Sequence, residues 1–319
     1  MNARPLHGVT ASEMETHLAA LFNDGDATVG LFGPESMLWT IGRESVVVLG
    51  GGRAALLQLA HPFIAHAVKE HSSLLDDIRG RFQRTLSSMF TMTFGDRAEA
   101  IRLARHIYEL HRTIRGTLPD SEGDYRAGQP YSALNRKAMF WVAATLWDTS
   151  IAVYEQIIGP LSAADKDAYY SETKVFCRLF GLSSADMPAD WRQFRTYVDD
   201  ICASSALHVG PVARQLAQDI FMPPNPVIAP LYAWIRLMTA ATLAPPLRQA
   251  YGLTYGPRER IAYQAGLVAL RRVVPRLPDS IRYCPEYIDA RRRLAGEPGL
   301  DRFSEAWRRT VLKLLGPLV

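Results

Sequence analysis

Histidines are concentrated in one part of the 319-residue chain. Metal binding is therefore the first chemistry to test. Five of the eight lie between residues 51 and 116, namely His61, His66, His71, His106 and His111. The first three are spaced five apart, a step that turns side chains by about 140° on a helix, so they cannot all face one ion. The chain also contains neither Glu-x-x-His nor His-Glu-x-x-His, the patterns of di-iron and zinc sites. The spacing disfavours a metal ion held by several histidines.

One imidazole is enough to bind a haem iron, and His111 is placed for that role. The expected helix 96–116 turns apolar residues, among them Ala104 and Tyr108, toward the same side as His111. If that helix is continuous, Arg115 lies one turn further on the same side, where it could meet a haem propionate. A histidine on an apolar face is also often a hydrogen-bonded core residue. The residues alone leave both interpretations open.

The elements that must position these side chains are helical almost throughout. Apolar residues recur at spacings of three and four, and two-residue alternation is rare. No linker or repeat divides the chain, so we expect one compact all-α, multi-helix domain over residues 1–319. The first helix should start at Thr10 or Ser12 and reach about Phe22, and another should start after Ser162 and end before Gly181. The remaining long helices are expected at 96–116, 135–158, 188–207, 227–243, 257–274 and 300–315.

The segment 44–55 departs from this pattern, because a run of valines leads into three glycines. Gly50, Gly52 and Ala55 match G-x-G-x-x-A, which in a dinucleotide-binding fold follows a strand. Pro62 interrupts the helix that should follow, and no second strand run appears, so nucleotide binding is disfavoured. The preferred expectation is a short hairpin or tight turn, followed by a helix that packs closely because glycine has no side chain.

Composition excludes several classes of protein. With 48% hydrophobic and 21% charged residues the chain is not intrinsically disordered, and a mean hydropathy of -0.05 excludes a polytopic membrane protein. Three widely spaced cysteines and the absence of an apolar leader favour the cytoplasm. The apolar stretch 226–247 carries Arg236 at its middle, so we expect a buried helix and no transmembrane segment.

The positive charge is concentrated at the C-terminal end. Residues 256–319 hold 13 Lys or Arg against 7 Asp or Glu. A solvated helical surface is the preferred interpretation, peripheral contact with an anionic membrane is the lesser one, and no nucleic-acid partner is expected.

A series of motifs carries a family resemblance. In chain order they are Gly51-Gly-Arg-Ala-Ala-Leu-Leu-Gln-Leu-Ala-His-Pro, Ala67-Val-Lys-Glu-His-Ser, Arg81-Phe-Gln-Arg-Thr, Phe94-Gly, His111-Arg-Thr-Ile-Arg-Gly, Tyr131-Ser-Ala, Trp141-Val-Ala-Ala-Thr-Leu, Arg236-Leu-Met-Thr and Leu247-Arg-Gln-Ala-Tyr-Gly-Leu. Over about residues 32–294 the chain resembles bacterial members of the family that contains the fungal oxygenase MpaB and the latex clearing proteins, or rubber oxygenases.

The resemblance implies a globin-related helical core and one b-type haem. His111 is similar to the proximal iron ligand, with His106 as the second candidate. Arg81, Arg84 and Thr85 look like the distal Arg-x-x-Lys-Thr run, with arginine in place of lysine. A lysine amine can lose its proton and bind iron, whereas arginine stays charged.

The carboxylate base proposed for rubber oxygenases has no secure counterpart. Glu70 is the nearest carboxylate in the sequence, so cleavage of polyisoprene is not implied.

The sequence therefore predicts a haem b-dependent oxygenase that acts on an apolar, alkene-bearing or lipid-like small molecule. Dioxygen would bind opposite His111, with Arg81, Arg84 and Thr85 as hydrogen-bond donors, and an unidentified partner would supply electrons. Phe140, Trp141 and Trp234 are the candidates to line the substrate pocket. Two alternatives are a cofactor-free helical protein that binds lipids or small molecules, and a haem enzyme that uses peroxide.

Overall fold

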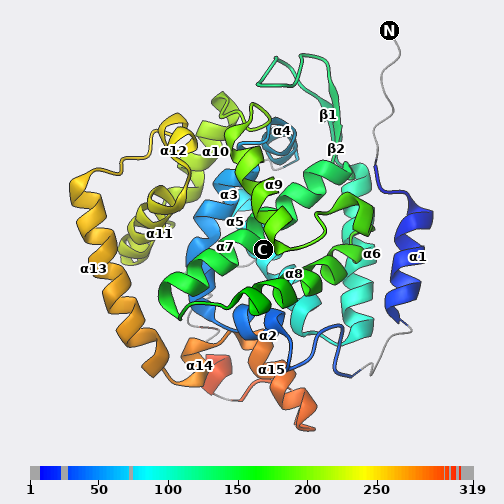
Figure 1. Ribbon diagram of the computed structural model, residues 1–319, viewed down its shortest axis with the longest axis vertical. Coiled ribbons are helices and arrows are strands. Elements are labelled where there is room, and N and C mark those ends of the chain that lie inside the picture. Colours follow the sequence, from blue (N-terminus) through cyan, green and yellow to red (C-terminus); the bar gives the residue numbers. More distant parts are fainter. Residues whose placement is uncertain are drawn as a thin grey trace.

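The computed structural model describes residues 8–22, 28–71, 75–297, 299–301, 303–306 and 309, without the side chains of 75–79 and 81–83. Within these residues the protein is a mostly helical, compact structure with one small sheet (Figure 1). The α-helices are α1 Ala11–Phe22, α2 Met37–Gly42, α3 Gly51–Leu59, α4 Pro62–Glu70, α5 Leu75–Phe94, α6 Arg97–Thr113, α7 Arg136–Ile157, α8 Ala163–Arg178, α9 Trp191–Ala203, α10 Pro211–Phe221, α11 Ala229–Thr242, α12 Pro245–Ala250, α13 Pro257–Val273, α14 Asp279–Arg282 and α15 Pro285–Leu294. Short 3-10 helices occupy η1 Ser45–Gly50, η2 Ser184–Asp186, η3 Pro226–Ile228 and η4 Val274–Arg276, and the strands are β1 Arg115–Thr117 and β2 Pro130–Ser132.

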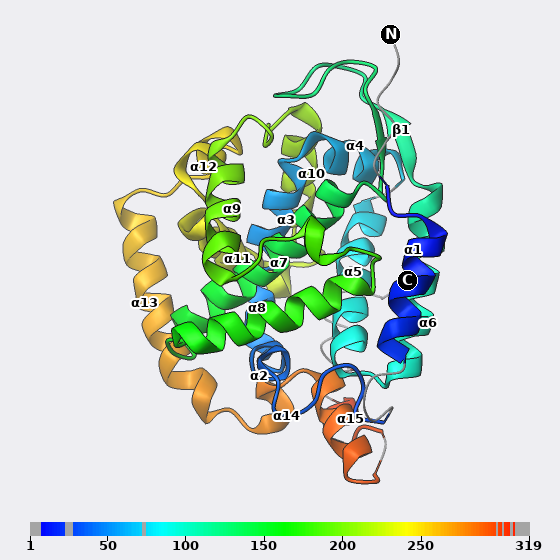
Figure 2. The same cartoon turned by 45° about the vertical axis from the view of Figure 1, so that its right-hand side comes forward.

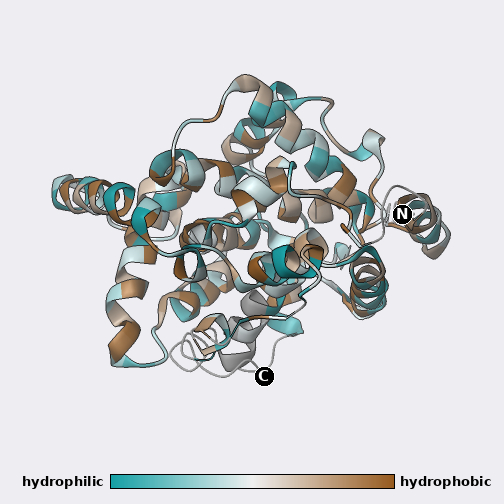
Figure 3. Cartoon of the chain, turned by 90° about the horizontal axis from the view of Figure 1, so that it is seen from below, coloured by the Kyte–Doolittle hydropathy of each residue, from teal (hydrophilic) through white to brown (hydrophobic). Residues whose placement is uncertain are grey.

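The helices are arranged around α7. It packs against α3 and η1 and also contacts α2, α8, α9 and α13. The pair α1 and α6 lies on one side of the molecule, and α11 and α13 lie on the opposite side (Figures 1 and 2). Hydrophobic and hydrophilic residues alternate along the same helices (Figure 3). This is the amphipathic pattern that lets each helix bury one face in a shared core.

Capping side chains set the helix boundaries that the sequence predicts best. Asn135 accepts a hydrogen bond from the Ala138 amide at the start of α7, and Ser162 and Asp165 form a reciprocal capping box at the start of α8. These starts and that of α1 are confirmed. The expected helix 188–207 is shortened to α9, and the expected helix 300–315 lies largely outside the described residues.

The expected strand before the glycines is wrong, because the valine run forms η1 and continues directly into α3. The close packing of the glycines is confirmed. A methyl group at Gly50 would lie 2.5 Å from Cγ2 of Thr149, and one at Gly52 would lie 2.4 Å from Oγ1 of Thr239. The glycines therefore let α3 approach α7 and α11, and no nucleotide-binding turn is formed.

We expect Gly52→Ala to destabilise the protein by about 1–3 kcal/mol, because the added methyl group has no room beside α11. Gly51→Ala is the matched control, since nothing lies within 4 Å of the methyl position there and its backbone is helical. That control should be neutral or stabilising by about 0.5–1 kcal/mol. Urea unfolding of the two variants checks the prediction, and equal stabilities would contradict it.

Among the described residues, no single helix has both the length and the apolar character needed to cross a membrane. The segments Ser45–Leu59 and Pro62–Glu70 meet that criterion only together, with a bend of 103° between them. Most residues of α3 and α4 are buried inside the protein.

Candidate functional site

The candidate site is built on the helical hairpin of α5 and α6. Gly95 and Asp96 connect the two helices, and Asp96 caps α6 by accepting a hydrogen bond from the Glu99 amide. A methyl group at Gly95 would lie 2.4 Å from the Thr91 carbonyl oxygen, so the turn requires glycine. The helices pack against each other and lie side by side (Figure 2).

His111 lies near the end of α6, on the side that faces the protein. Its side chain is half-buried, Ala104 and Tyr108 on the preceding turns are buried, and His106 is exposed. His111 therefore lies on the same helical face as two buried residues, as the spacing predicts. Exposure makes His106 the weaker candidate for a ligand that must be shielded from water.

Arg84 and Thr85 lie on the helix packed against α6. Residues equally distant from the turn of an antiparallel hairpin lie at the same height, so His111 is level with Gly80. A methyl group at Gly80 would lie 2.9 Å from Nη1 of Arg84, so the guanidinium runs back along α5 toward that height. Thr85 is half-buried beside it. The side chain of Arg81 lies outside the described residues.

The expected position of Arg115 is wrong. α6 ends at Thr113, Ile114 is extended, and Arg115 is the first residue of β1. Its exposed side chain does not continue the helical face of His111, and its guanidinium donates a hydrogen bond to the Arg112 carbonyl oxygen. Arg115 could therefore contact a haem only from β1 and not from the end of α6.

A hydrogen-bonded pair of polar side chains, Tyr131 and Glu70, lies just past the end of α6, and the sequence does not predict that they meet. Gly116 pairs with Tyr131 across β1 and β2, and the Tyr131 hydroxyl donates a hydrogen bond to Glu70 at the end of α4. A methyl group at Gly116 would lie 2.5 Å from that hydroxyl oxygen and 2.7 Å from Oε2 of Glu70. Burial, together with Glu70, raises the pKa of Tyr131, so its hydroxyl keeps its proton. The structure thus brings Glu70 to the strand that follows His111.

The family comparison applies to this hairpin. A sequence model of the family described as ER-bound oxygenase mpaB/B'/Rubber oxygenase, catalytic domain, matches residues 38–273, well over half of the chain. The protein belongs to the MpaB/rubber oxygenase family. The matched region lies within the stretch 32–294 where the resemblance was expected and contains α5 and α6. Neither the curated proteins nor the solved structures include a match to the chain.

Membership in the MpaB/rubber oxygenase family indicates an oxygenase, and the donors at the hairpin fit a haem. A haem needs one imidazole on one side and hydrogen-bond donors on the other, and α6, which carries His111, packs against α5, which carries an exposed Arg84 and a half-buried Thr85. Within the described part of the chain, no group of three or more His, Cys, Asp or Glu residues could hold a bare metal ion. A single imidazole on α6, such as that of His111, is the kind of ligand that a haem iron needs.

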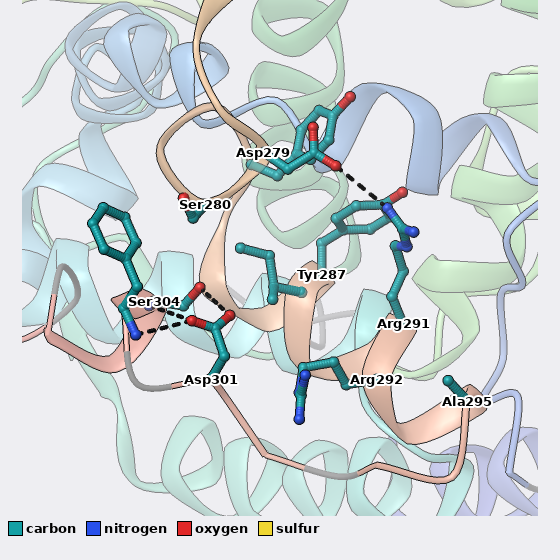
Figure 4. Close-up of a pocket in the computed structure, with 11 residues that line it drawn as sticks. Asp279, Ser280, Tyr287, Arg291, Arg292, Ala295, Asp301 and Ser304 are labelled. Atoms are coloured by element: carbon teal, nitrogen blue, oxygen red, sulfur yellow. Dashed lines mark hydrogen bonds and ion pairs between the residues drawn. The ribbon is translucent and has the colours of Figure 1, made fainter.

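Two cavities lie elsewhere in this MpaB/rubber oxygenase member. One, of about 500 Å³, is bounded by α14, α15 and the residues Asp301, Phe303 and Ser304 (Figure 4). Its polar groups bind one another, since Arg291 pairs with Asp279 at 3.6 Å and Asp301 accepts a hydrogen bond from Ser304. The other, of about 390 Å³, lies among α10, α11 and α13. His111 lines neither cavity.

The residues expected to line a substrate pocket lie in packed regions, and none of them lines either cavity. Trp141 is 2% exposed and donates a hydrogen bond to the Leu57 carbonyl oxygen, and Phe140 is also buried. Trp234 stacks on Tyr263. Their large apolar surfaces stabilise the fold, so this part of the prediction is corrected.

Two further histidines of the 51–116 stretch, His61 and His66, have separate partners around α4. Nε2 of His66 lies 3.1 Å from Oε1 of Glu122, and Nε2 of His61 lies 3.0 Å from the Tyr125 hydroxyl. His71 is exposed at the end of the helix. Because of the five-residue spacing, the imidazoles of His61, His66 and His71 lie in different surroundings.

We expect His61 to make the fold sensitive to acid. Burial lowers its pKa from 6.5 to about 4, so the unfolded chain takes up the proton first as the pH falls. The free energy of unfolding should therefore drop by about 2 kcal/mol between about pH 7 and about pH 5, and His61→Gln should lack this contribution. Urea unfolding at the two pH values tests the difference, and parallel pH profiles for the two proteins would contradict it.

Proposed function

We propose that the protein is a haem b-dependent oxygenase that acts on an apolar small molecule. The observation that carries the proposal is the family match, whose span contains His111 and the run from Arg81 to Thr85 on two packed antiparallel helices. The proposal includes a core related to the globins, dioxygen as oxidant, a separate electron donor and a cytoplasmic location. The substrate class rests on the resemblance, with alkene-bearing and lipid-like molecules as the first to test.

His111 would hold the cofactor through one imidazole nitrogen. Bound haem would supply the redox-active iron on which dioxygen chemistry depends. A hydrogen bond from the other ring nitrogen would orient the imidazole. The half-buried position of His111 limits access of water to that contact.

Arg84 and Thr85 would act from the helix opposite His111. The guanidinium N–H groups and the Oγ1–H of threonine can donate hydrogen bonds to dioxygen and to negative charge that develops on it. Arg81 has the same proposed role from its place in the motif, and Arg115 could reach a propionate from β1. Because arginine stays protonated, Arg84 would remain a donor and would not alternate as an amine ligand.

The pair of Tyr131 and Glu70 would hold a proton near the same end of the hairpin. The proton stays on Oη of Tyr131, and Glu70 accepts the hydrogen bond. This arrangement would keep Glu70 oriented toward β1. We propose a positioning role for the pair and not direct contact with substrate.

The test is to load the purified full-length protein with haem and measure bound haem and the absorbance spectrum together. A stoichiometric complex with a Soret band supports the proposal, and product formation with dioxygen but not with peroxide supports an oxygenase. A protein that stays colourless would overturn the haem assignment. That result would favour a cofactor-free binding protein, for which the two cavities away from His111 are the supporting observation.

A further inference from the structure

The cavity among α10, α11 and α13 has an apolar interior. Phe221, Leu237, Ala240 and Leu253 contribute to its lining, and Ala240 and Leu253 are buried. Its volume of about 390 Å³ lies within the range of small-molecule sites. Two of the helices that contribute to its lining, α11 and α13, lie on the side of the molecule opposite α6 (Figure 1). No residue of α5 or α6 lines the cavity, so it is separate from the proposed haem site.

Arg236 supplies a positive charge to this cavity. It lies on α11, lines the cavity and is exposed. No hydrogen bond or ion pair joins its guanidinium to any described residue, whereas the arginines lining the other cavity have carboxylate partners. An exposed guanidinium presents donors that match the two oxygens of a carboxylate.

Glu259 also lines the cavity, but its carboxylate already accepts a hydrogen bond from elsewhere in the chain. Glu259 accepts a hydrogen bond from the Gly256 amide at 2.8 Å and so caps the start of α13. The structure gives no ion pair between Glu259 and Arg236. The guanidinium is therefore the group in this lining that is available to an anion.

Apolar side chains are also exposed on the elements that form the cavity. Met222 after α10 is 50% exposed, Val227 in η3 is 74% exposed and Ile261 on α13 is 72% exposed. Each of them is within two positions in the sequence of a residue that lines the cavity.

We propose that this cavity binds an amphipathic carboxylate, with the apolar chain in the cavity and the carboxylate on Arg236. The apolar lining matches the chain, and the unpaired guanidinium matches the head group. The site is independent of the proposed haem site, so it is available to a substrate in transit, a product or an effector. The free molecule is the proposed ligand, and a bilayer surface is the competing source of the same chemistry.

Calorimetric titration of the full chain with decanoate and with decanol tests the proposal. Decanoate should bind more tightly than decanol, and Arg236→Gln should weaken decanoate binding by about tenfold or more while leaving decanol unchanged. Arg260→Gln is the control, because Arg260 is an exposed arginine of α13 that does not line the cavity. Ala233→Phe, at an exposed lining position, should weaken binding of both probes by filling the cavity.

Sedimentation with vesicles of phosphatidylcholine and a minority of phosphatidylglycerol distinguishes the two sources. Binding of decanoate without binding of vesicles supports the proposal. Binding of vesicles without decanoate would overturn it in favour of a membrane surface. Equal affinity for decanoate in Arg236→Gln and the natural protein, with helical content unchanged by circular dichroism, would also overturn it.

Discussion

Replacing His111 with alanine is expected to abolish the Soret band of the haem-loaded protein. The proposal gives the iron one protein ligand on this side, and no described carboxylate, histidine or cysteine cluster could replace it as a metal site. Because His111 is half-buried at the end of α6, its loss should cost the fold only about 1 kcal/mol. Haem quantitation and circular dichroism on the same sample separate loss of cofactor from loss of structure.

His106→Ala is the matched control for that experiment. His106 lies on the same helix but is exposed, so its removal should leave both the spectrum and the bound haem unchanged. An intact Soret band in the His111 variant together with a lost band in the His106 variant would reassign the ligand. An unchanged spectrum in both variants would move the haem away from α6.

The sequence predicts the start of α6 well because its signals are local. The spacing of apolar residues defines α6, and the short Gly95–Asp96 turn places His111 level with the start of the distal run. The end of α6 is predicted three residues too late. Arg115 and Gly116 pair with Ser132 and Tyr131, and that pairing crosses a long loop with no local signal.

Long-range packing also explains the other errors. The valines before Gly50 favour a strand by composition, but η1 packs against α7 and α11, so burial decides the conformation. The same limit applies to the hydrogen bond between Tyr131 and Glu70, since nothing in the spacing of these residues indicates that they meet. Trp141 is predicted in a pocket because of its type, whereas its neighbours place it in the core.

The largest loss of stability is expected from Asp148→Ala. Asp148 is 3% exposed on α7, and its two carboxylate oxygens bind Arg53 on α3 and Arg195 on α9. Arg53 also donates hydrogen bonds to Oγ1 of Thr149 and to the Thr242 carbonyl oxygen, so this network joins α3, α7, α9 and α11. Removing the carboxylate leaves the guanidinium of Arg53 largely buried without its countercharge.

That uncompensated charge should lower the free energy of unfolding by about 3–5 kcal/mol, measured by urea denaturation. Asp199→Ala is the control, because Asp199 binds Arg195 at 2.7 Å but its side chain is 67% exposed. An exposed pair of this kind is worth about 0.5 kcal/mol. If the unpaired charge of Arg53 is the cause, adding Arg53→Met to Asp148→Ala should recover part of the lost free energy of unfolding. A double variant less stable than Asp148→Ala would instead show that Arg53 stabilises the fold through Thr149 and Thr242 even without its carboxylate partner.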